Sequence, residues 1–441
     1  MHILKKTLSK LTKKIEVLNL DIITMELKRV VVTGIGTINP LGKNLSETWE
    51  NMKNGVSGSQ KITRFDASKF KTQFACEVKN YDTKEYFDRK ESRKLDLYAQ
   101  FALIAATEAV NDAGIENNSN IDKDRVGVIW ASGIGGLMTF QDECISFGRG
   151  DGTPRFSPFF IPKMISDIAA GQISIKYGFH GPNFGTVSAC ASSTNAIIDA
   201  LNYIRLGKAD IIVTGGSEAS ISQAGIGGFN SMQALSTNNE EYETASRPFC
   251  NTRDGFVMGE GGAGLILEEY EHAKARGAKI YAEIVGGGMS ADAYHLTATH
   301  PEGLGAAKCM NLAIEDAGLK PEDIDYVNVH GTATPVGDIP ETLAIVKVFG
   351  EHAYKLNVSS TKSMTGHLLG AAGAIESIAA IMTLQHNIVP PTINHREADP
   401  NIDSKLNLTL HKAQEKEVNA VLSNTFGFGG HNASVVFKKI D

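Results

Sequence analysis

An internal repeat constrains the fold of this chain more than any other feature. Residues 109–115 (AVNDAGI) match residues 313–319 (AIEDAGL) at an offset of 204 residues. Two further matches follow in the same order, at offsets of 171 and 168 residues: VSAC at 187–190 with VSST at 358–361, and GG at 261–262 with GG at 429–430. The first half therefore holds about 33 extra residues ahead of its VSAC motif. A repeat of this size predicts two similar domains packed against each other.

Short β-branched segments alternate with helical patterns in this chain. A helical pattern over residues 97–113 ends at Gly114, a typical helix C-cap. The first expected strand, RVVV, runs into a predicted glycine turn at 33–36 (TGIG). Strands that alternate with helices predict a layered α/β fold. The expected strands are 29–32, 125–131 and 209–215. The extra segment, residues 134–180, contains RFSPFFIPKM and is predicted to form a cap or a subunit contact.

The net charge of −7 is unevenly distributed. Residues 1–25 carry five Lys, two acidic residues, one Ser and no Arg, so the rest of the chain stands at −10. This segment lacks the apolar core of a secretory signal, and a transit peptide would be rich in Arg and Ser. We expect a disordered extension, or an upstream start codon with Met25 as the functional start. The acidity argues against nucleic-acid binding, and no apolar run approaches the ~18–20 residues of a membrane span.

The five cysteines are odd in number and show no C-x-x-C spacing, which favours a reducing, cytoplasmic setting over a disulfide framework. Cys190 follows a short strand and precedes small residues that open a helix. At a helix N-terminus the dipole and the free N–H groups would stabilise a thiolate, and the N–H groups could also form an oxyanion hole. A small buried cysteine is an equally good interpretation of this local pattern.

Two histidines occupy comparable positions. His330 ends the expected strand DYVNVH beside a glycine turn, at the edge of an α/β sheet where sites usually lie. His367 is predicted in the first turn of a helix, where the positive helix end favours the neutral imidazole. Lys362 and Glu376 flank it among small and apolar residues, and buried charges of this kind need a partner. We therefore expect them to orient the histidines from behind, although a solvated ion pair is the simpler interpretation.

Several cofactor classes are excluded by missing patterns. The chain contains no G-x-x-x-x-G-K-[ST] loop and no G-x-G-x-x-G fingerprint in a βαβ setting, which argues against nucleotide and nicotinamide chemistry. The histidines lack the H-E-x-x-H spacing, which argues against catalytic zinc. The motif NTFGFGGHN near the C-terminus places Phe428 between glycines, either as a buried ring in a turn or as a gate over the nucleophile.

Four motifs together resemble the β-ketoacyl-[acyl carrier protein] synthases of the thiolase-like superfamily. They are VSACASS, NVHGTATPVGD, SSTKSMTGHLLGAAGAIES and NTFGFGGHN, and the resemblance runs from Met25 to the end of the chain. A thiolase would have a second reactive Cys, and starter-unit synthases have Asn where this chain has His367. The Cys–His–His set, SGIGG at 132–136 and the Leu after His367 resemble the elongating synthases II.

The resemblance implies a thiolase-like fold in which two duplicated α/β halves form a five-layered αβαβα architecture. The N-terminal half would span residues 26–276 and carry the nucleophile and the cap insertion. The C-terminal half would span residues 277–441 and carry both catalytic histidines.

The resemblance also implies roles for single residues. Cys190 would accept the acyl group, while His330 and His367 assist malonyl decarboxylation. Lys362 would orient the site and Glu376 would support it. Phe428 would be the gate, and its backbone N–H, together with that of Cys190, would form the oxyanion hole. Ile134 and Phe229 would line the acyl pocket. Thr332 and Thr334 would contact the pantetheine arm. No metal is expected to be essential, and a structural cation near Asn328, Glu376, Ser423 and Asn424 is an open alternative.

The implied reaction is the decarboxylative condensation of acyl-carrier protein with malonyl-carrier protein in fatty acid elongation, by a cytoplasmic homodimer. No cofactor is expected, because 4′-phosphopantetheine is carried by the substrate. The carrier protein is acidic, so a basic patch is needed, and Arg89, Lys90, Arg93 and Lys94 form one. Gln233 stands where many relatives have Arg, which would weaken one contact. The alternatives are a stand-alone ketosynthase of a polyketide or specialised lipid pathway and a non-catalytic chain-length factor.

Overall fold

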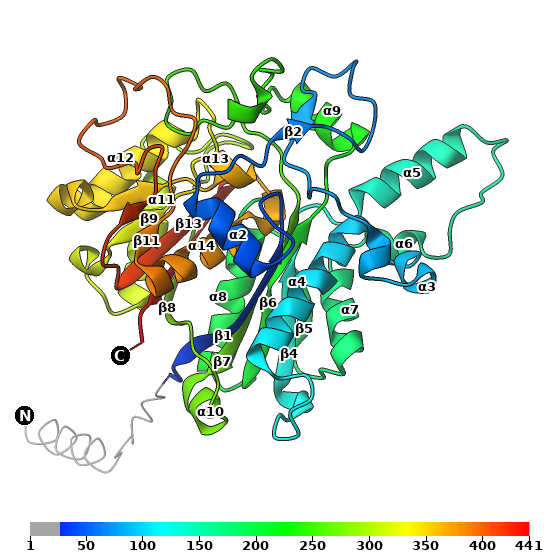
Figure 1. Ribbon diagram of the computed structural model, residues 1–441, viewed down its shortest axis with the longest axis horizontal. Helices are drawn as coiled ribbons and strands as arrows, with labels where there is room; N and C mark the ends of the chain where they lie inside the picture. The colour runs from blue at the N-terminus through cyan, green and yellow to red at the C-terminus, as the bar shows by residue number, and fades with distance from the viewer. Residues whose placement is uncertain (1–26, 441) are drawn as a thin grey trace, which may run out of the picture.

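The computed structural model describes residues 27–440, so the predicted extension at residues 1–25 lies outside the described residues (Figure 1). Ten strands form one large sheet in the order β10-β9-β13-β14-β8-β1-β7-β6-β4-β5. Their bounds are β1 (Val30–Ile38), β4 (Val126–Ala131), β5 (Asn183–Thr186), β6 (Ile211–Glu218), β7 (Gly261–Glu269), β8 (Ala282–Ala291), β9 (Tyr326–Asn328), β10 (Asn357–Ser359), β13 (Ala420–Gly427) and β14 (His431–Lys438). Two small sheets pair β2 (Gln60–Lys61) with β3 (Phe74–Ala75) and β11 (Ile388–Val389) with β12 (Gln414–Glu415).

The sheet consists of two halves with the same internal pattern. In the first half, β4 runs parallel to β5 and β6, and the strand order continues antiparallel through β7 to β1. In the second half, β9 runs parallel to β10 and β13, and the order continues antiparallel through β14 to β8. Only three residue pairs, between 30–32 and 282–284, join β1 to β8. The predicted duplication is confirmed.

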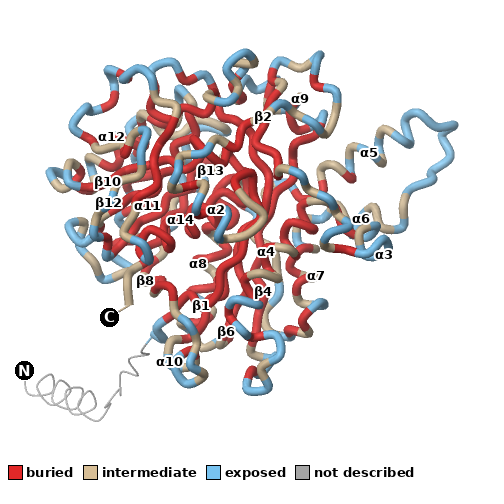
Figure 2. Tube along the Cα trace, in the orientation of Figure 1, coloured by how far each residue is buried: buried red, intermediate tan, exposed pale blue. Residues whose placement is uncertain are grey.

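Helices cover both faces of each half and produce five layers. α4 (Leu97–Ala113) and α7 (Ile168–Tyr177) cover the outer face of the first half, and α11 (Leu304–Asp316) and α12 (Asp338–Phe349) that of the second. α8 (Ser192–Arg205) and α14 (Ala372–His386) each contact strands of both halves, and therefore lie between them. Residues 372–384 of α14 are all buried, which suits a helix that is apolar on all sides (Figure 2). The predicted αβαβα architecture is confirmed.

The remaining helices decorate this core. They are α2 (Leu45–Lys53), α3 (Arg89–Ser92), α5 (Leu137–Gly148), α6 (Phe160–Met164), α9 (Gln223–Ser231), α10 (Tyr270–Ala275) and α13 (Lys362–Thr365), with short 3-10 turns that include η6 (Leu369–Ala371). None of the helices in residues 27–440 has the length and apolarity needed to cross a membrane.

The predicted glycine turn at 33–36 is wrong, because β1 continues to Ile38. A Cβ on Gly34 would lie 2.3 Å from the carbonyl oxygen of Ala109, and one on Gly36 would lie 2.2 Å from that of Ala105. The glycines therefore let α4 pack directly on the strand.

One part of the insertion, which contains α5 and α6, forms an arm that projects from the body of the molecule (Figure 1). The other part contains α7, which packs on β4 and β5 of the first half, so the prediction of a cap or subunit contact is wrong for that part. Aromatic side chains stack along it: Phe147 on Phe156, and Phe156 on Phe160, with ring centroids 5.2 and 5.5 Å apart. Phe140, Phe147 and Phe156 are all exposed.

Candidate active site

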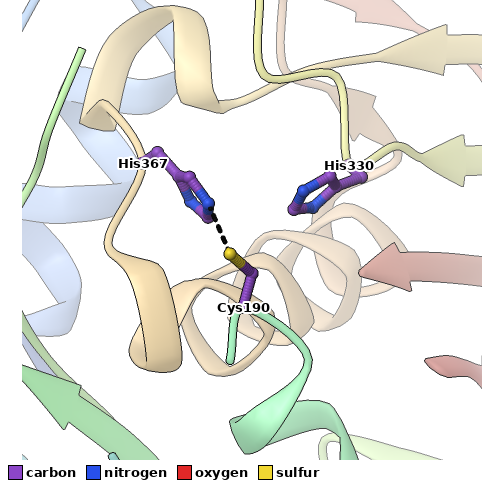
Figure 3. Close-up of side chains that lie close together, drawn as sticks. All are labelled: Cys190, His330 and His367. Atoms are coloured by element: carbon purple, nitrogen blue, oxygen red, sulfur yellow. Dashed lines mark hydrogen bonds between the residues drawn. The ribbon is translucent and has the colours of Figure 1, made fainter. Parts of the chain in front are cut away.

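Three predicted residues from the two halves meet at one point (Figure 3). Cys190 precedes α8 of the first half, whereas His330 follows β9 and His367 follows α13 in the second. The Nε2 atom of His367 lies 3.0 Å from the Sγ atom of Cys190. One ring nitrogen of each histidine and the sulfur all lie within 4.8 Å of one another. The three side chains line a cavity of about 590 Å³.

A strained turn presents the cysteine, as the strand–turn–helix pattern predicts. Ala189 has a φ of +50°, a conformation that L side chains rarely adopt. Local hydrogen bonds hold the turn: the Ser192 hydroxyl donates to the Ala189 carbonyl at 2.6 Å, and the Ser188 N–H donates to the Ser192 hydroxyl at 2.9 Å. Gly427 of β13 packs against the turn so closely that a Cβ there would lie 3.1 Å from the Cys190 nitrogen.

The predicted thiolate stabilisation at Cys190 is wrong for the free protein. Burial raises the pKa of the Cys190 thiol to about 12, although the charge of Lys362 and the Phe428 backbone N–H both lower it. The loss of water around the sulfur therefore outweighs the stabilisation of the thiolate by Lys362 and by the Phe428 N–H. The resting nucleophile is a thiol that must lose its proton when it attacks.

Both histidines are neutral, as predicted for His367, but the main cause is different. Burial, and then the charge of Lys362, hold the pKa of each imidazole well below its usual value. His367 lies between α13 and η6 instead of in the first turn of a helix, so that part of the prediction is wrong. Its backbone N–H donates to the Val257 carbonyl at 2.7 Å, which anchors it to the first half.

Lys362 and Glu376 form a buried ion pair behind the histidines, with side chains only 2% and 1% exposed. Burial raises the pKa of Glu376 to about 7, and the ammonium group of Lys362 acts in the opposite direction. Neither residue lines the cavity. Lys362 therefore influences the site through its charge, by keeping the imidazoles neutral and lowering the pKa of Cys190.

Buried oxygen atoms beside this pair fit a structural cation. Asn328 Oδ1, Glu376 Oε2 and Ser423 Oγ have no hydrogen-bond partner among the described residues. Asn328 and Ser423 sit opposite each other on β9 and β13. Asn424 Oδ1 is already occupied, because it accepts from the Ser434 hydroxyl at 2.7 Å. Three unpartnered oxygens suit a hard cation.

Cys190, His330 and His367 are also spaced closely enough to hold a metal ion. The absence of an H-E-x-x-H spacing argues against zinc only for histidines that lie close together in the sequence. Residues distant in sequence can nevertheless supply such a set, so this argument does not apply to the folded site.

The residues predicted for the acyl pocket, the pantetheine arm and the gate share one cavity, and their roles stay predictions. Ile134, Phe229, Thr332, Thr334 and Phe428 line the same cavity as Cys190. The Phe428 ring lies 6.3 Å from that of Phe229, in the turn between β13 and β14. The hydroxyls of Thr332 and Thr334 are 3.0 Å apart. The four basic residues around α3 are exposed and do not line the cavity.

Two buried carboxylates at the site were missed. Glu341 accepts from the backbone N–H groups of His330 and Gly331, at 2.8 and 2.7 Å. Glu218, at the end of β6, accepts from the loop that carries Ile134 and from Gly370. The available signal was an acidic residue within an otherwise apolar or small-residue segment.

A buried thiol, two neutral imidazoles and a backbone N–H around one cavity are the groups of an enzyme that passes an acyl group through a cysteine. Comparison with known families agrees. Residues 27–273 match the model of the Beta-ketoacyl synthase, N-terminal domain, and residues 281–396 match that of the Beta-ketoacyl synthase, C-terminal domain. The chain belongs to the β-ketoacyl synthase family and is a condensing acyltransferase of fatty acid elongation.

Individual relatives are similar along nearly the whole chain. A Staphylococcus aureus (strain COL) protein named 3-oxoacyl-[acyl-carrier-protein] synthase 2 is 49% identical over 414 residues, which are 94% of this chain and 99% of that protein. A protein of the same name from Coxiella burnetii is 47% identical over 416 residues, 94% of this chain and all of that protein.

Solved structures show the same fold. A β-ketoacyl synthase from Burkholderia phymatum STM815 matches with a TM-score of 0.87 and 35% identity, over 94% of this chain and all of that one. The same values hold for a chain of the AntDE:AntF complex, described as a type II polyketide synthase acyl-carrier protein with its ketosynthase bound to the hexaketide.

Proposed function

We propose that the chain forms 3-oxoacyl-carrier protein from acyl-carrier protein and malonyl-carrier protein, with Cys190 as the acyl carrier between the two half-reactions. The 3.0 Å contact between Cys190 Sγ and His367 Nε2, with His330 beside them at a large cavity, is the observation that carries this proposal.

In the first half-reaction, the Cys190 thiol attacks the acyl thioester. Because its pKa is raised to about 12, its proton has to leave as the C–S bond forms, and the nearest base is Nε2 of neutral His367. The backbone N–H groups of Cys190 and Phe428 stabilise the tetrahedral oxyanion. The carrier-protein thiol departs and takes up that proton, so the exchange is balanced.

In the second half-reaction, malonyl-carrier protein loses CO₂ and leaves an enolate. N–H groups of His330 and His367 stabilise its oxygen, because a neutral imidazole can donate one N–H bond to a developing oxyanion. For His367, whose Nε2 accepts the thiol proton in the first half-reaction, this step requires the tautomer that carries the proton on Nε2. The enolate carbon attacks the acyl thioester, a C–C bond forms and the Cys190–carbon bond breaks. The released thiolate takes up one proton from solvent and restores the thiol.

The surrounding residues serve these steps from fixed positions. Lys362 keeps the imidazoles neutral, Glu376 balances its charge, and Phe428 acts as the gate. Ile134 and Phe229 bound the acyl pocket, while Thr332 and Thr334 contact the pantetheine arm. A cation held by Asn328, Glu376 and Ser423 would supply structural charge compensation and take no part in the chemistry. The substrate carries its own 4′-phosphopantetheine, so the enzyme needs no cofactor.

An acyl carrier protein is the proposed partner, at the exposed side chains of Arg89, Lys90, Arg93 and Lys94. The structural neighbour from the AntDE:AntF complex, a ketosynthase described with its carrier protein, supports this partner. The exposed stacked aromatics of the arm support a homodimer, because apolar patches of this kind mark interfaces.

Intact-mass measurement of the acyl-enzyme tests the chemistry. Cys190→Ala abolishes the acyl adduct and condensation, whereas Cys144→Ala, at an exposed cysteine outside the cavity, leaves both unchanged. His330→Ala blocks decarboxylation while acyl transfer to Cys190 persists, whereas His367→Ala blocks decarboxylation and also slows acyl transfer, because His367 is the base nearest to the thiol. An acyl-enzyme on the Cys190→Ala variant would overturn the nucleophile assignment.

Two further measurements test the partners. Lys90→Glu/Lys94→Glu raises the KM for malonyl-carrier protein, and the matched pair Lys308→Glu/Lys320→Glu, exposed at α11 and just beyond it, does not. Phe147→Asp/Phe156→Asp shifts sedimentation toward a monomer. An unchanged KM or an unchanged sedimentation coefficient rejects the corresponding surface.

A second candidate, a stand-alone polyketide ketosynthase, is supported by the polyketide neighbour at 35% identity, against 49% for the fatty acid synthase relative. Elongation with purified carrier protein across a series of saturated and 3-oxoacyl chains separates the two, since a polyketide enzyme would prefer 3-oxo chains.

A further inference from the structure

Glu218 is a buried carboxylate that none of the proposed steps uses. It ends β6 and is fully buried. Its Oε2 atom accepts from the backbone N–H groups of Gly133, at 2.8 Å, and Gly370, at 3.0 Å. Its Oε1 atom accepts from the Ser132 hydroxyl at 3.1 Å and from the Ile134 N–H at 3.3 Å.

The donors belong to two separate segments of the cavity. Residues 132–134 follow β4 of the first half and place Ile134 on the cavity wall. Gly370 belongs to η6 of the second half, three residues after His367. A single carboxylate therefore joins the proposed acyl-pocket wall to the segment that carries a proposed decarboxylation residue.

The two segments meet backbone to backbone. A Cβ on Gly370 would lie 2.1 Å from the Gly133 nitrogen, and a Cβ on Gly133 would lie 3.4 Å from the carbonyl oxygen of Ala189, just before Cys190. Both N–H groups point at the same oxygen atom, so the Glu218 carboxylate satisfies two buried donors at the junction of the segments.

The carboxylate also acts as a charge at the site. Within the described residues, 27–440, the Glu218 carboxylate forms no ion pair. Only neutral N–H and O–H donors stabilise it. Its field reaches the nucleophile, where it raises the pKa of Cys190. Burial raises the pKa of Glu218 to about 7 in spite of its hydrogen-bond donors, and its ionised form lies within electrostatic reach of the reacting sulfur.

We propose that Glu218 is a positioning residue that fixes Ile134 relative to His367 and thereby couples acyl-chain selection to decarboxylation. The inference rests on the proposed function, in which Ile134 bounds the acyl pocket and His367 stabilises the enolate.

Glu218→Gln tests the coupling. It keeps the size of the side chain and replaces one acceptor by an NH₂ group that faces backbone N–H donors. We expect condensation kcat to fall at least tenfold while the KM for malonyl-carrier protein stays within threefold. We also expect the ratio of kcat/KM for long over short acyl chains to change at least threefold.

Glu268→Gln is the matched control. Glu268 is an equally buried carboxylate on β7, but its partners Arg276 and Thr33 do not line the cavity, whereas Gly133 and Ile134, which donate to Glu218, do. A merely structural role predicts that both variants lose the same share of activity at every acyl length, in step with their thermal unfolding. That result overturns the proposal.

Ser132→Ala keeps the test decisive if Glu218→Gln does not fold. It removes one hydrogen bond to Oε1, and the one that the Ser132 hydroxyl accepts from the Gly135 N–H, but it keeps the carboxylate, so the chain-length ratio shifts in the same direction by a smaller factor. An unchanged ratio in this variant also rejects the coupling. Absence of acyl-Cys190 in the unmodified protein would instead reject the proposed function, so the two failures are distinguishable.

Discussion

Gly427→Ala adds a single methyl group beneath the nucleophile. Its Cβ would lie 2.8 Å from the Ser188 carbonyl oxygen, 3.1 Å from the Cys190 nitrogen and 3.2 Å from the Ala191 nitrogen. Ordinary contact begins at 3.4 Å, so the turn has to move by about 0.6 Å. A misplacement of 1 Å costs roughly 100-fold in rate, so 0.6 Å costs roughly 15-fold, or about 1.6 kcal/mol.

Steady-state kcat/KM for condensation and the rate of Cys190 acylation measure this effect. Both should fall, because the same turn sets the sulfur and the N–H donor of Cys190. Gly228→Ala is the matched control, since Gly228 is an exposed helical glycine whose added Cβ meets nothing within 4 Å. If Gly427→Ala retains the full acylation rate of Gly228→Ala, the close contact with the nucleophile turn has no catalytic consequence and the reasoning is refuted.

Four other predictions follow from the same geometry. Alkylation of Cys190 by iodoacetamide should accelerate about tenfold per pH unit up to at least pH 10, because its pKa is raised to about 12 and the thiolate fraction keeps rising; a plateau near pH 9 contradicts this. Malonyl decarboxylation should show no acid limb near pH 6.5, because both imidazole pKa values are lowered and the rings stay neutral there; an inflection at pH 6–7 in the pH–rate profile would count against it. Phe428→Ala should allow malonyl decarboxylation before acylation, measured as CO₂ release without acyl donor, and no such release argues against a gate. Gly36→Ala should lower the free energy of unfolding by about 1–3 kcal/mol in denaturant titration, because its Cβ would lie 2.2 Å from the Ala105 carbonyl; an unchanged midpoint excludes this contact as a packing constraint.

Local patterns predicted the parts of the site that are built locally. The strand, small residues and helix around Cys190 predicted the turn that the structure shows. The pKa of its thiol could not be predicted in this way, because the surfaces that bury the sulfur come from the other half of the chain. The same holds for His367, whose neutral state depends more on enclosure than on any helix end.

The wrong prediction at residues 33–36 and the failure to identify Glu218 both come from sequence patterns that more than one structure can produce. A glycine in TGIG signals either a turn or a close approach, and only the position of α4 over β1 decides between them. Glu218 lies in a run of small residues, and its donors come from positions 85 and 152 residues away. A single sequence contains no mark of such a long-range contact, so the carboxylate was missed while the motifs around it were recognised.

The position of β1 has a consequence for how the chain is made. This first strand occupies the middle of the sheet, and Val30 pairs with Glu269 and Ile284, 239 and 254 residues later. At about 5–20 residues per second, synthesis of those partners takes roughly 12–50 s. Throughout that interval the apolar Val30–Val32 segment has two open edges, a state prone to aggregation. Chains that stop before β7 would keep both edges open permanently, which makes early termination a hazard for the cell as well as a loss of enzyme.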